Sequence, residues 1–188
     1  MTSTSADSVS AVLHITAAAG GGADRYIRDL AATTARRHHL MHVGGGPTVV
    51  EDVKGQRYVP IANLSAPSVD HDALRRWLEL SGIGIVHVHG ADEACRAHLD
   101  ALLRARSLPY LVTLHDLQFV NPRAFEADGM PEPDADWILA VDPMLKRAAT
   151  VIAPSEFILE IALVCSPGIR ATVIAPGVRA SPVATVPE

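Results

Sequence analysis

The chain has 188 residues, 48% of them hydrophobic and 20% charged, which suits one soluble globular domain with a full core. Its net charge of −5 and the lack of a basic stripe argue against nucleic acid as the main partner. Two cysteines are too few for a disulfide framework or a CxxC zinc site. No apolar run approaches membrane-spanning length, and Met1–Ser10 lacks the positive charge of a signal peptide. The cytoplasm is therefore the expected compartment.

The first predicted element is a buried strand that runs into a glycine-rich turn. Ala11–Thr16 is apolar and suits a covered strand, and Gly20–Gly22 permit positive φ and a close approach of a ligand to the backbone. Apolar residues then recur at helical spacing, at Ala23, Tyr26, Ile27, Leu30, Ala31 and Thr34. The N-terminus of such a helix can seat a phosphate or another anion. A tight turn without a ligand is the alternative interpretation.

Strands and helices are expected to alternate along the rest of the chain. Arg36, Arg37, His38 and His39 form the densest basic cluster, which we interpret as the solvated end of the first helix. Segment Gln118–Asp136 holds three prolines and is expected to be irregular and variable. Strands are predicted at 40–43, 48–53, 57–62, 85–89, 110–115, 151–153 and 171–175, and helices from Asp70, over 92–106 and 137–148, and after the N-cap Ser155.

This alternation predicts βαβ units, that is, an α/β, Rossmann-like fold with a mainly parallel sheet and helices on both faces. Ligands bind such sheets beyond the carboxyl ends of the strands. Four polar or glycine-rich segments follow predicted strands, namely Gly20–Gly22, His89-Gly90, His115-Asp116 and Pro154-Ser155. Because these segments should share one edge of the sheet, the sequence predicts a cleft there.

Common cofactor motifs are missing from this pattern. Arg25 occupies the third glycine position of a dinucleotide fingerprint, and Glu51 comes too late to bind a ribose. His87 and His89 share a strand face and could form a metal pair, but no third ligand has a sensible spacing, so one packed histidine and one at the strand end is the preferred interpretation. Asp134 and Asp136 resemble a metal-binding D-x-D motif but are better explained as helix-start carboxylates. No metal or other cofactor is expected.

His115 is the sharpest candidate for chemistry. It leaves the predicted strand 110–115 at the cleft edge, where an imidazole can donate a hydrogen bond to a substrate hydroxyl or stabilise developing charge. The adjacent Asp116 could orient the ring.

Together these residues resemble group-1 glycosyltransferases, enzymes of GT-B architecture with two Rossmann-like domains facing across a cleft. The resemblance covers residues 11–178 and rests on the order of five segments. The segments are Val12–Thr16 with Gly20–Gly22, Ile85–Gly90, Tyr110–Asp116, Val151–Glu156 and Val173–Val178. The last of them looks like the hinge strand of that family but lacks its asparagine.

The resemblance implies an N-terminal, acceptor-side domain at 11–178, after a disordered 1–10 and before a linker at 179–188. It implies transfer of a sugar from a nucleotide-sugar donor to a glycan, lipid or other hydroxyl acceptor, as in polysaccharide biosynthesis, with retained anomeric configuration. His115 would be the catalytic-site histidine, and the substrate-binding residues would be Gly20, Gly21, Gly22, His89, Asp116 and Ser155. The resemblance also allows the full-length protein to associate peripherally with a membrane.

One family feature is missing from this sequence. The family's second domain holds the donor through two glutamates separated by seven residues, but Asp134 follows Glu126 at that distance and Val164 follows Glu156. We therefore expect a partner domain for donor binding and no turnover by this chain alone. Two other classes stay open: a non-catalytic GT-B-like binding module, and half of a sugar-nucleotide epimerase. A flavodoxin-like regulator would leave the glycines and the His-Asp pair without a purpose.

Overall fold

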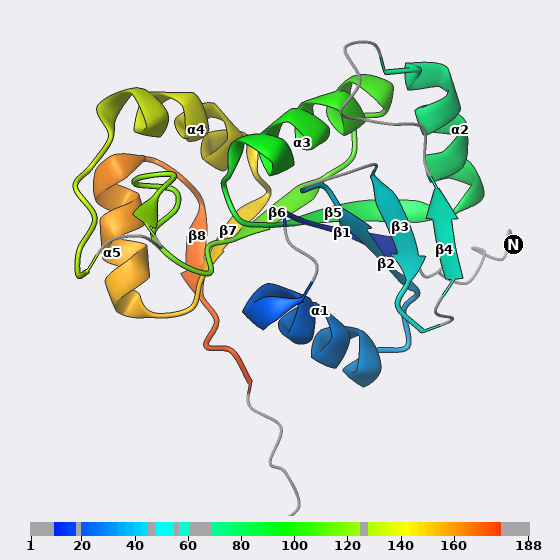
Figure 1. The fold of residues 1–188 in the computed structure, drawn as a ribbon, viewed down its shortest axis with the longest axis horizontal. Helices are drawn as coiled ribbons and strands as arrows, with labels where there is room; N and C mark the ends of the chain where they lie inside the picture. The colour runs from blue at the N-terminus through cyan, green and yellow to red at the C-terminus, as the bar shows by residue number, and fades with distance from the viewer. Residues whose placement is uncertain are drawn as a thin grey trace, which may run out of the picture.

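The protein folds around one eight-stranded sheet (Figure 1). The computed structural model describes residues 10–17, 20–44, 48–54, 57–60, 69–124 and 128–177. The strand order is β4-β3-β2-β1-β5-β6-β7-β8. The neighbours in the part β2-β1-β5-β6-β7-β8 pair in parallel. The pairs β2–β3 and β3–β4 are antiparallel. The strands are β1 Ala11–Thr16, β2 His38–His42, β3 Val49–Asp52, β4 Arg57–Pro60, β5 Ile83–His89, β6 Tyr110–Thr113, β7 Thr150–Ala153 and β8 Ala171–Val173.

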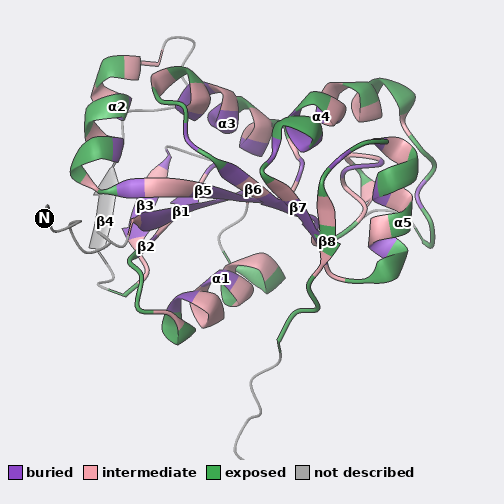
Figure 2. Ribbon diagram, turned by 180° about the vertical axis from the view of Figure 1, so that it is seen from behind, coloured by how far each residue is buried: buried purple, intermediate pink, exposed green. Residues whose placement is uncertain are grey.

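Within the described residues, five helices connect and cover these strands. They are α1 Gly21–Thr33, α2 His71–Leu80, α3 Glu93–Ala105, α4 Ala135–Arg147 and α5 Glu156–Cys165. Figures 1 and 2 show α1 on one face of the sheet and α2, α3 and α4 on the other, while α5 packs beside β7 and β8. The predicted α/β, Rossmann-like fold with helices on both faces is confirmed.

Side-chain caps explain where most of the helices begin. The predicted starts at Asp70 and Ser155 are confirmed, because each side chain accepts a hydrogen bond from a backbone N–H in the first turn of its helix. Asp92 caps α3 in the same way, and Asp134 caps α4. The interpretation of the Asp134 pair as helix-start carboxylates is therefore confirmed.

The interpretation of the basic cluster is wrong for its two histidines. Helix α1 ends at Thr33, and the backbone of Thr34 is already extended, with φ −115 and ψ 154. His38 and His39 are the first two residues of β2, and the His38 side chain is buried. His39 is half-buried with its ring 6.2 Å from that of Trp77. Only Arg36 and Arg37 are solvent-exposed.

Smaller differences concern element ends and coverage. Ile83 and Gly84 precede the predicted strand 85–89 but belong to β5, and β6 ends at Thr113, so His115 lies just beyond its strand. Both cysteines are free thiols, Cys95 buried and Cys165 half-buried. The predicted N-terminal tail, apart from Ser10, and the predicted linker 179–188 lie outside the described residues.

The two faces of the sheet differ in chemistry. The face under α2, α3 and α4 is built from Leu13, Ile15, Met41, Val86, Val88 and Val112, which are buried and apolar. Strand register places His14, Leu40 and His87 side by side on the opposite face, under α1, and residues two positions along share that face. The layer between α1 and the sheet is therefore rich in histidine.

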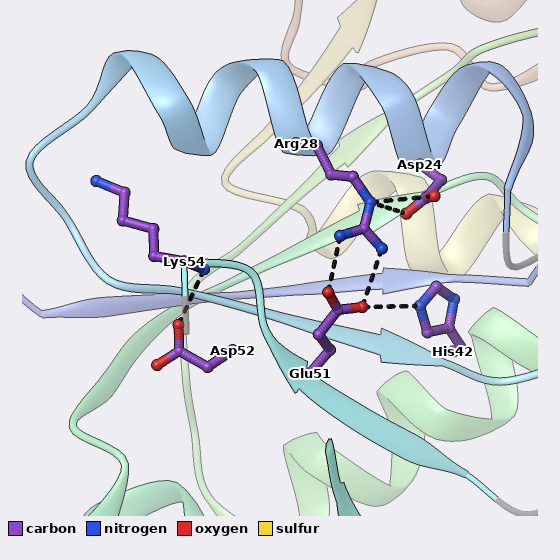
Figure 3. A network of polar contacts seen from close by, with 6 residues as sticks. All are labelled: Asp24, Arg28, His42, Glu51, Asp52 and Lys54. Carbon is purple, nitrogen blue, oxygen red and sulfur yellow. Dashed lines mark hydrogen bonds and ion pairs between the residues drawn. The ribbon is translucent and has the colours of Figure 1, made fainter. Parts of the chain in front are cut away.

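An ion-pair network holds α1 to this polar face (Figure 3). The Arg28 guanidinium donates to both Glu51 carboxylate oxygens, at 2.7 and 2.9 Å, and to Asp24 at 3.2 Å. Glu51, on β3, has a side chain only 3% exposed, and the His42 ring lies 4.0 Å from its carboxylate. Because a buried carboxylate needs a partner, this network ties α1 to the β2–β3 end of the sheet.

Candidate functional site at the carboxyl edge of the sheet

The N-terminus of α1 opens onto the carboxyl edge of the sheet. Gly20 is its N-cap with φ 84, no side chain caps the helix, and Gly21 has φ 83. A Cβ built on Gly20, Gly21 or Gly22 would meet no atom of the described residues within 4 Å. The positive φ therefore favours glycine at the first two positions, and none of the described side chains fills the space beside these glycines.

His115 stands at the same edge, next to α1. Its Nε2 lies 3.0 Å from Nδ1 of His89, the last residue of β5, and both rings lie beside Tyr26 of α1, with centroids 5.5 and 5.8 Å from the tyrosine ring. Burial lowers the pKa of His115, and the neighbouring Asp116 partly opposes this shift. A half-buried, neutral imidazole therefore lies beside Tyr26, on the helix that follows the glycine turn.

His89 is fixed in turn by histidines that sequence reasoning did not assign to the site. His89 Nε2 is 2.9 Å from His14 Nδ1, and His14 Nε2 is 2.8 Å from His38 Nδ1. Burial is the main cause that lowers the pKa of each of these three rings, and nearby histidines add to it for His14 and His89. One signal was available in the sequence, because His14 interrupts an otherwise apolar strand and therefore needs a polar partner inside the core.

His87 lies in the same layer with a different partner. Its Nε2 is 2.7 Å from Thr113 Oγ1, and burial lowers its pKa to about 4. As predicted, His87 is packed inside the sheet and His89 is the last residue of its strand. His89 is nevertheless buried as well. His14 supplies the third nitrogen that the sequence seemed to lack, within 4.8 Å of the other two. Both ring nitrogens of His14 and of His89 already face another histidine, so a cation bound to all three rings would have to displace at least one of these hydrogen bonds.

Asp116 and Ser155 lie at this edge with their side chains engaged locally. The exposed Asp116 carboxylate accepts a hydrogen bond from the Gln118 backbone N–H at 2.8 Å. Ser155 follows β7 and caps α5 by accepting from Ile158 N–H. The orienting partner of the His115 ring in this structure is His89 rather than Asp116.

A shallow apolar pocket adjoins the edge. It has a volume of about 360 Å³ and lies between α1 and the segment that follows β8. Its lining includes Tyr26, Leu30, Ile174, Ala175 and Gly177. The proposed hinge segment therefore lies against the helix whose tyrosine contacts His89 and His115. Among the described residues, no helix is both long and apolar enough to cross a bilayer.

The comparisons with known proteins agree with this arrangement. The profile of the family described as Glycosyltransferase Family 4 matches residues 20–181, and the chain belongs to that family. Its fold is similar to the sucrose-phosphate synthase from Thermosynechococcus elongatus, with a TM-score of 0.57 and 16% identity over 88% of this chain. The match covers 48% of that enzyme, so this chain spans about half its length. No curated protein shows significant sequence similarity.

Proposed function

We propose that this domain is the acceptor-side half of a glycosyltransferase that moves a sugar from a nucleotide-sugar donor to a glycan, lipid-linked or other hydroxyl acceptor. The observation that carries the proposal is that the glycine-lined N-terminus of α1 and His115 both follow the carboxyl ends of parallel strands, with the His115 ring 5.5 Å from that of Tyr26 on α1. Membership of the glycosyltransferase family supports it. The full enzyme would require a second, donor-binding domain facing this edge.

Two groups at the edge have distinct roles in this proposal. The first-turn N–H groups at Gly21 and Gly22 and the positive end of the helix dipole stabilise negative charge on a donor phosphate or on the acceptor. The His115 ring, neutral because burial lowers its pKa, forms a hydrogen bond to the transferred sugar near the reacting carbon. His89 orients that ring, and Asp116 and Ser155 contribute the polar rim of the cleft.

The experiment is a transfer assay on the protein that carries this domain together with its donor-binding domain. His115→Ala should lower kcat by at least about a hundredfold, the scale for losing one positioned polar group in a transition state. Gly21→Val should abolish transfer, because the branched residue strains the φ 83 backbone and fills the anion site. The matched control is His71→Ala, at the start of α2 on the other face of the sheet.

The outcomes separate the proposal from its rivals. Near-normal rates in both histidine variants would make His115 structural and refute the site. Absence of transfer in the unmodified protein, with a folded domain, would favour a non-catalytic binding module. Interconversion of the nucleotide-sugar without an acceptor would favour an epimerase.

A further inference from the structure

Four histidine rings from neighbouring segments are linked nitrogen to nitrogen across the face under α1. The links are His115 Nε2 to His89 Nδ1 at 3.0 Å, His89 Nε2 to His14 Nδ1 at 2.9 Å, and His14 Nε2 to His38 Nδ1 at 2.8 Å. His38 Nε2 then lies 2.6 Å from Thr34 Oγ1. We call His115, His89, His14 and His38 the imidazole chain; it runs from the candidate site to the end of α1.

The surroundings of the imidazole chain keep it uncharged. The side chains of His14, His38 and His89 are buried, and burial lowers the pKa of all four rings. The charged and titratable groups that face it are His87 of β5, Tyr26 of α1, Lys54 and Arg36 near His38, the neighbouring His39, and Asp116 near His115. Only Asp116 favours a charged ring, and it acts at the half-buried end. Each ring therefore carries one proton at neutral pH.

Counting protons leaves two arrangements. Three links need one proton each, and four neutral rings supply four, so one proton is left for an end of the chain. If every ring is protonated on Nδ1, His115 presents an Nδ1–H to the site. If every ring is protonated on Nε2, His115 presents a bare Nδ1 and the fourth proton sits on His38 facing Thr34. Any mixture leaves two lone pairs or two protons facing each other in a buried link, which costs about 1–3 kcal/mol.

We propose that the imidazole chain holds its four rings in one common tautomer, so that His14 and His38 are positioning residues that determine whether His115 donates or accepts a hydrogen bond. The consequence for catalysis rests on the proposed function, which assigns His115 to the substrate. Switching tautomer moves one proton across each link. One proton leaves His115 Nδ1 for solvent or a bound substrate, and one enters His38 Nε2 from Thr34 Oγ1, which takes up a proton from solvent in exchange. No ring becomes charged in either end state, and the number of protons is unchanged.

The test is long-range ¹H–¹⁵N correlation of the histidine rings in the ¹⁵N-histidine-labelled chain at neutral pH. The protonated nitrogen should be the same in His14, His38, His89 and His115. Cutting the chain with His14→Leu should change the Nδ1–H to Nε2–H ratio of His115 by about tenfold or more, the equivalent of one lost buried hydrogen bond. The matched control is His98→Leu, which removes a buried, hydrogen-bonded histidine of α3 outside the chain and should leave that ratio unchanged.

Different tautomers among the four wild-type rings would overturn the proposal. So would an unchanged His115 ratio in folded His14→Leu. If that variant does not fold, the wild-type spectrum still decides. Failure of the proposed function gives a different result. In that case the four rings still share one tautomer in the spectrum, but the transfer assay detects no sugar transfer.

Discussion

At the scale of single residues, Gly44 and Gly22 differ in what a side chain would meet. A Cβ on Gly44 would overlap the carbonyl oxygen of Ala17, a backbone atom that cannot swing aside, whereas a Cβ on Gly22 meets nothing within 4 Å. Gly44→Ala should lower the free energy of unfolding by about 1–3 kcal/mol. Gly22→Ala, inside α1, should raise it by at most about 1 kcal/mol. Urea unfolding of both variants measures this, and equal midpoints would contradict it.

The histidines show at the same scale what sequence alone could predict. His115 was identified because it follows an apolar strand whose end can be read from composition. The role of His38 was missed because no glycine or proline separates the exposed Arg36 and Arg37 from β2, so the cluster looked like one solvated helix end. The link between His14 and His38 depends on the register of neighbouring strands, which a single-sequence pattern does not contain.

At the scale of elements, the Arg28–Glu51 pair attaches α1 to β3. Arg28→Met should lower the free energy of unfolding by about 3 kcal/mol, because it leaves the buried Glu51 carboxylate without its bidentate partner. Adding Glu51→Leu should recover most of that loss, since the unpaired charge is then removed. Chemical denaturation of the single and double variants tests this. A double variant as unstable as Arg28→Met would show that the loss comes from packing rather than from the unpaired charge.

The histidine layer between β1 and β5 predicts a stability profile at mildly acidic pH. In the folded chain, His14, His87 and His89 have pKa values below the usual value of about 6.5. At a pH below about 6.5, the unfolded chain therefore binds more protons than the folded chain. The free energy of unfolding should be flat near pH 7–8 and fall from about pH 6.5 towards pH 4, where His87 protonates, by up to about 1.4 kcal/mol per pH unit for each histidine.

Denaturant titrations across this pH range measure the slope. His87→Leu should make it shallower by the contribution of one histidine. A wild-type stability that is constant from pH 7 to pH 5 would contradict the burial of these rings as neutral groups.

The element pattern itself was largely predictable. Apolar runs separated by helical periodicity predicted the parallel strands, and short polar side chains marked the starts of α2 and α5. The predicted strand 85–89 omits Ile83 and Gly84, because two closely spaced glycines are typical of a turn, whereas Gly84 packs against the Ser10 side chain inside the sheet. The antiparallel pairing of β3 with β2 and β4 followed from no pattern in those short segments.

At the scale of the whole molecule, the chain spans about half the length of the sucrose-phosphate synthase whose fold it resembles. Because the donor-binding domain would supply most of the contacts to the nucleotide, the chain by itself should give no sugar transfer and should bind nucleotide-sugars more weakly than micromolar. Isothermal titration calorimetry on residues 1–188 measures the affinity. Micromolar binding would contradict the assignment of donor binding to a second domain.

We propose that substrates bind this domain at the carboxyl edge of its sheet. The most direct measurement is a map of backbone amide and histidine ring shifts in the ¹⁵N-labelled chain on adding UDP-glucose or GDP-mannose at millimolar concentration. The competing location is a hollow of about 580 Å³ at the opposite edge, which is lined by Arg36, Arg37 and Lys54 together with Asp52. We predict shifts concentrated at Gly21, Gly22 and His115. Shifts confined to the arginine- and lysine-lined hollow, or none at the glycines and His115, would show that the carboxyl edge does not bind the nucleotide-sugar.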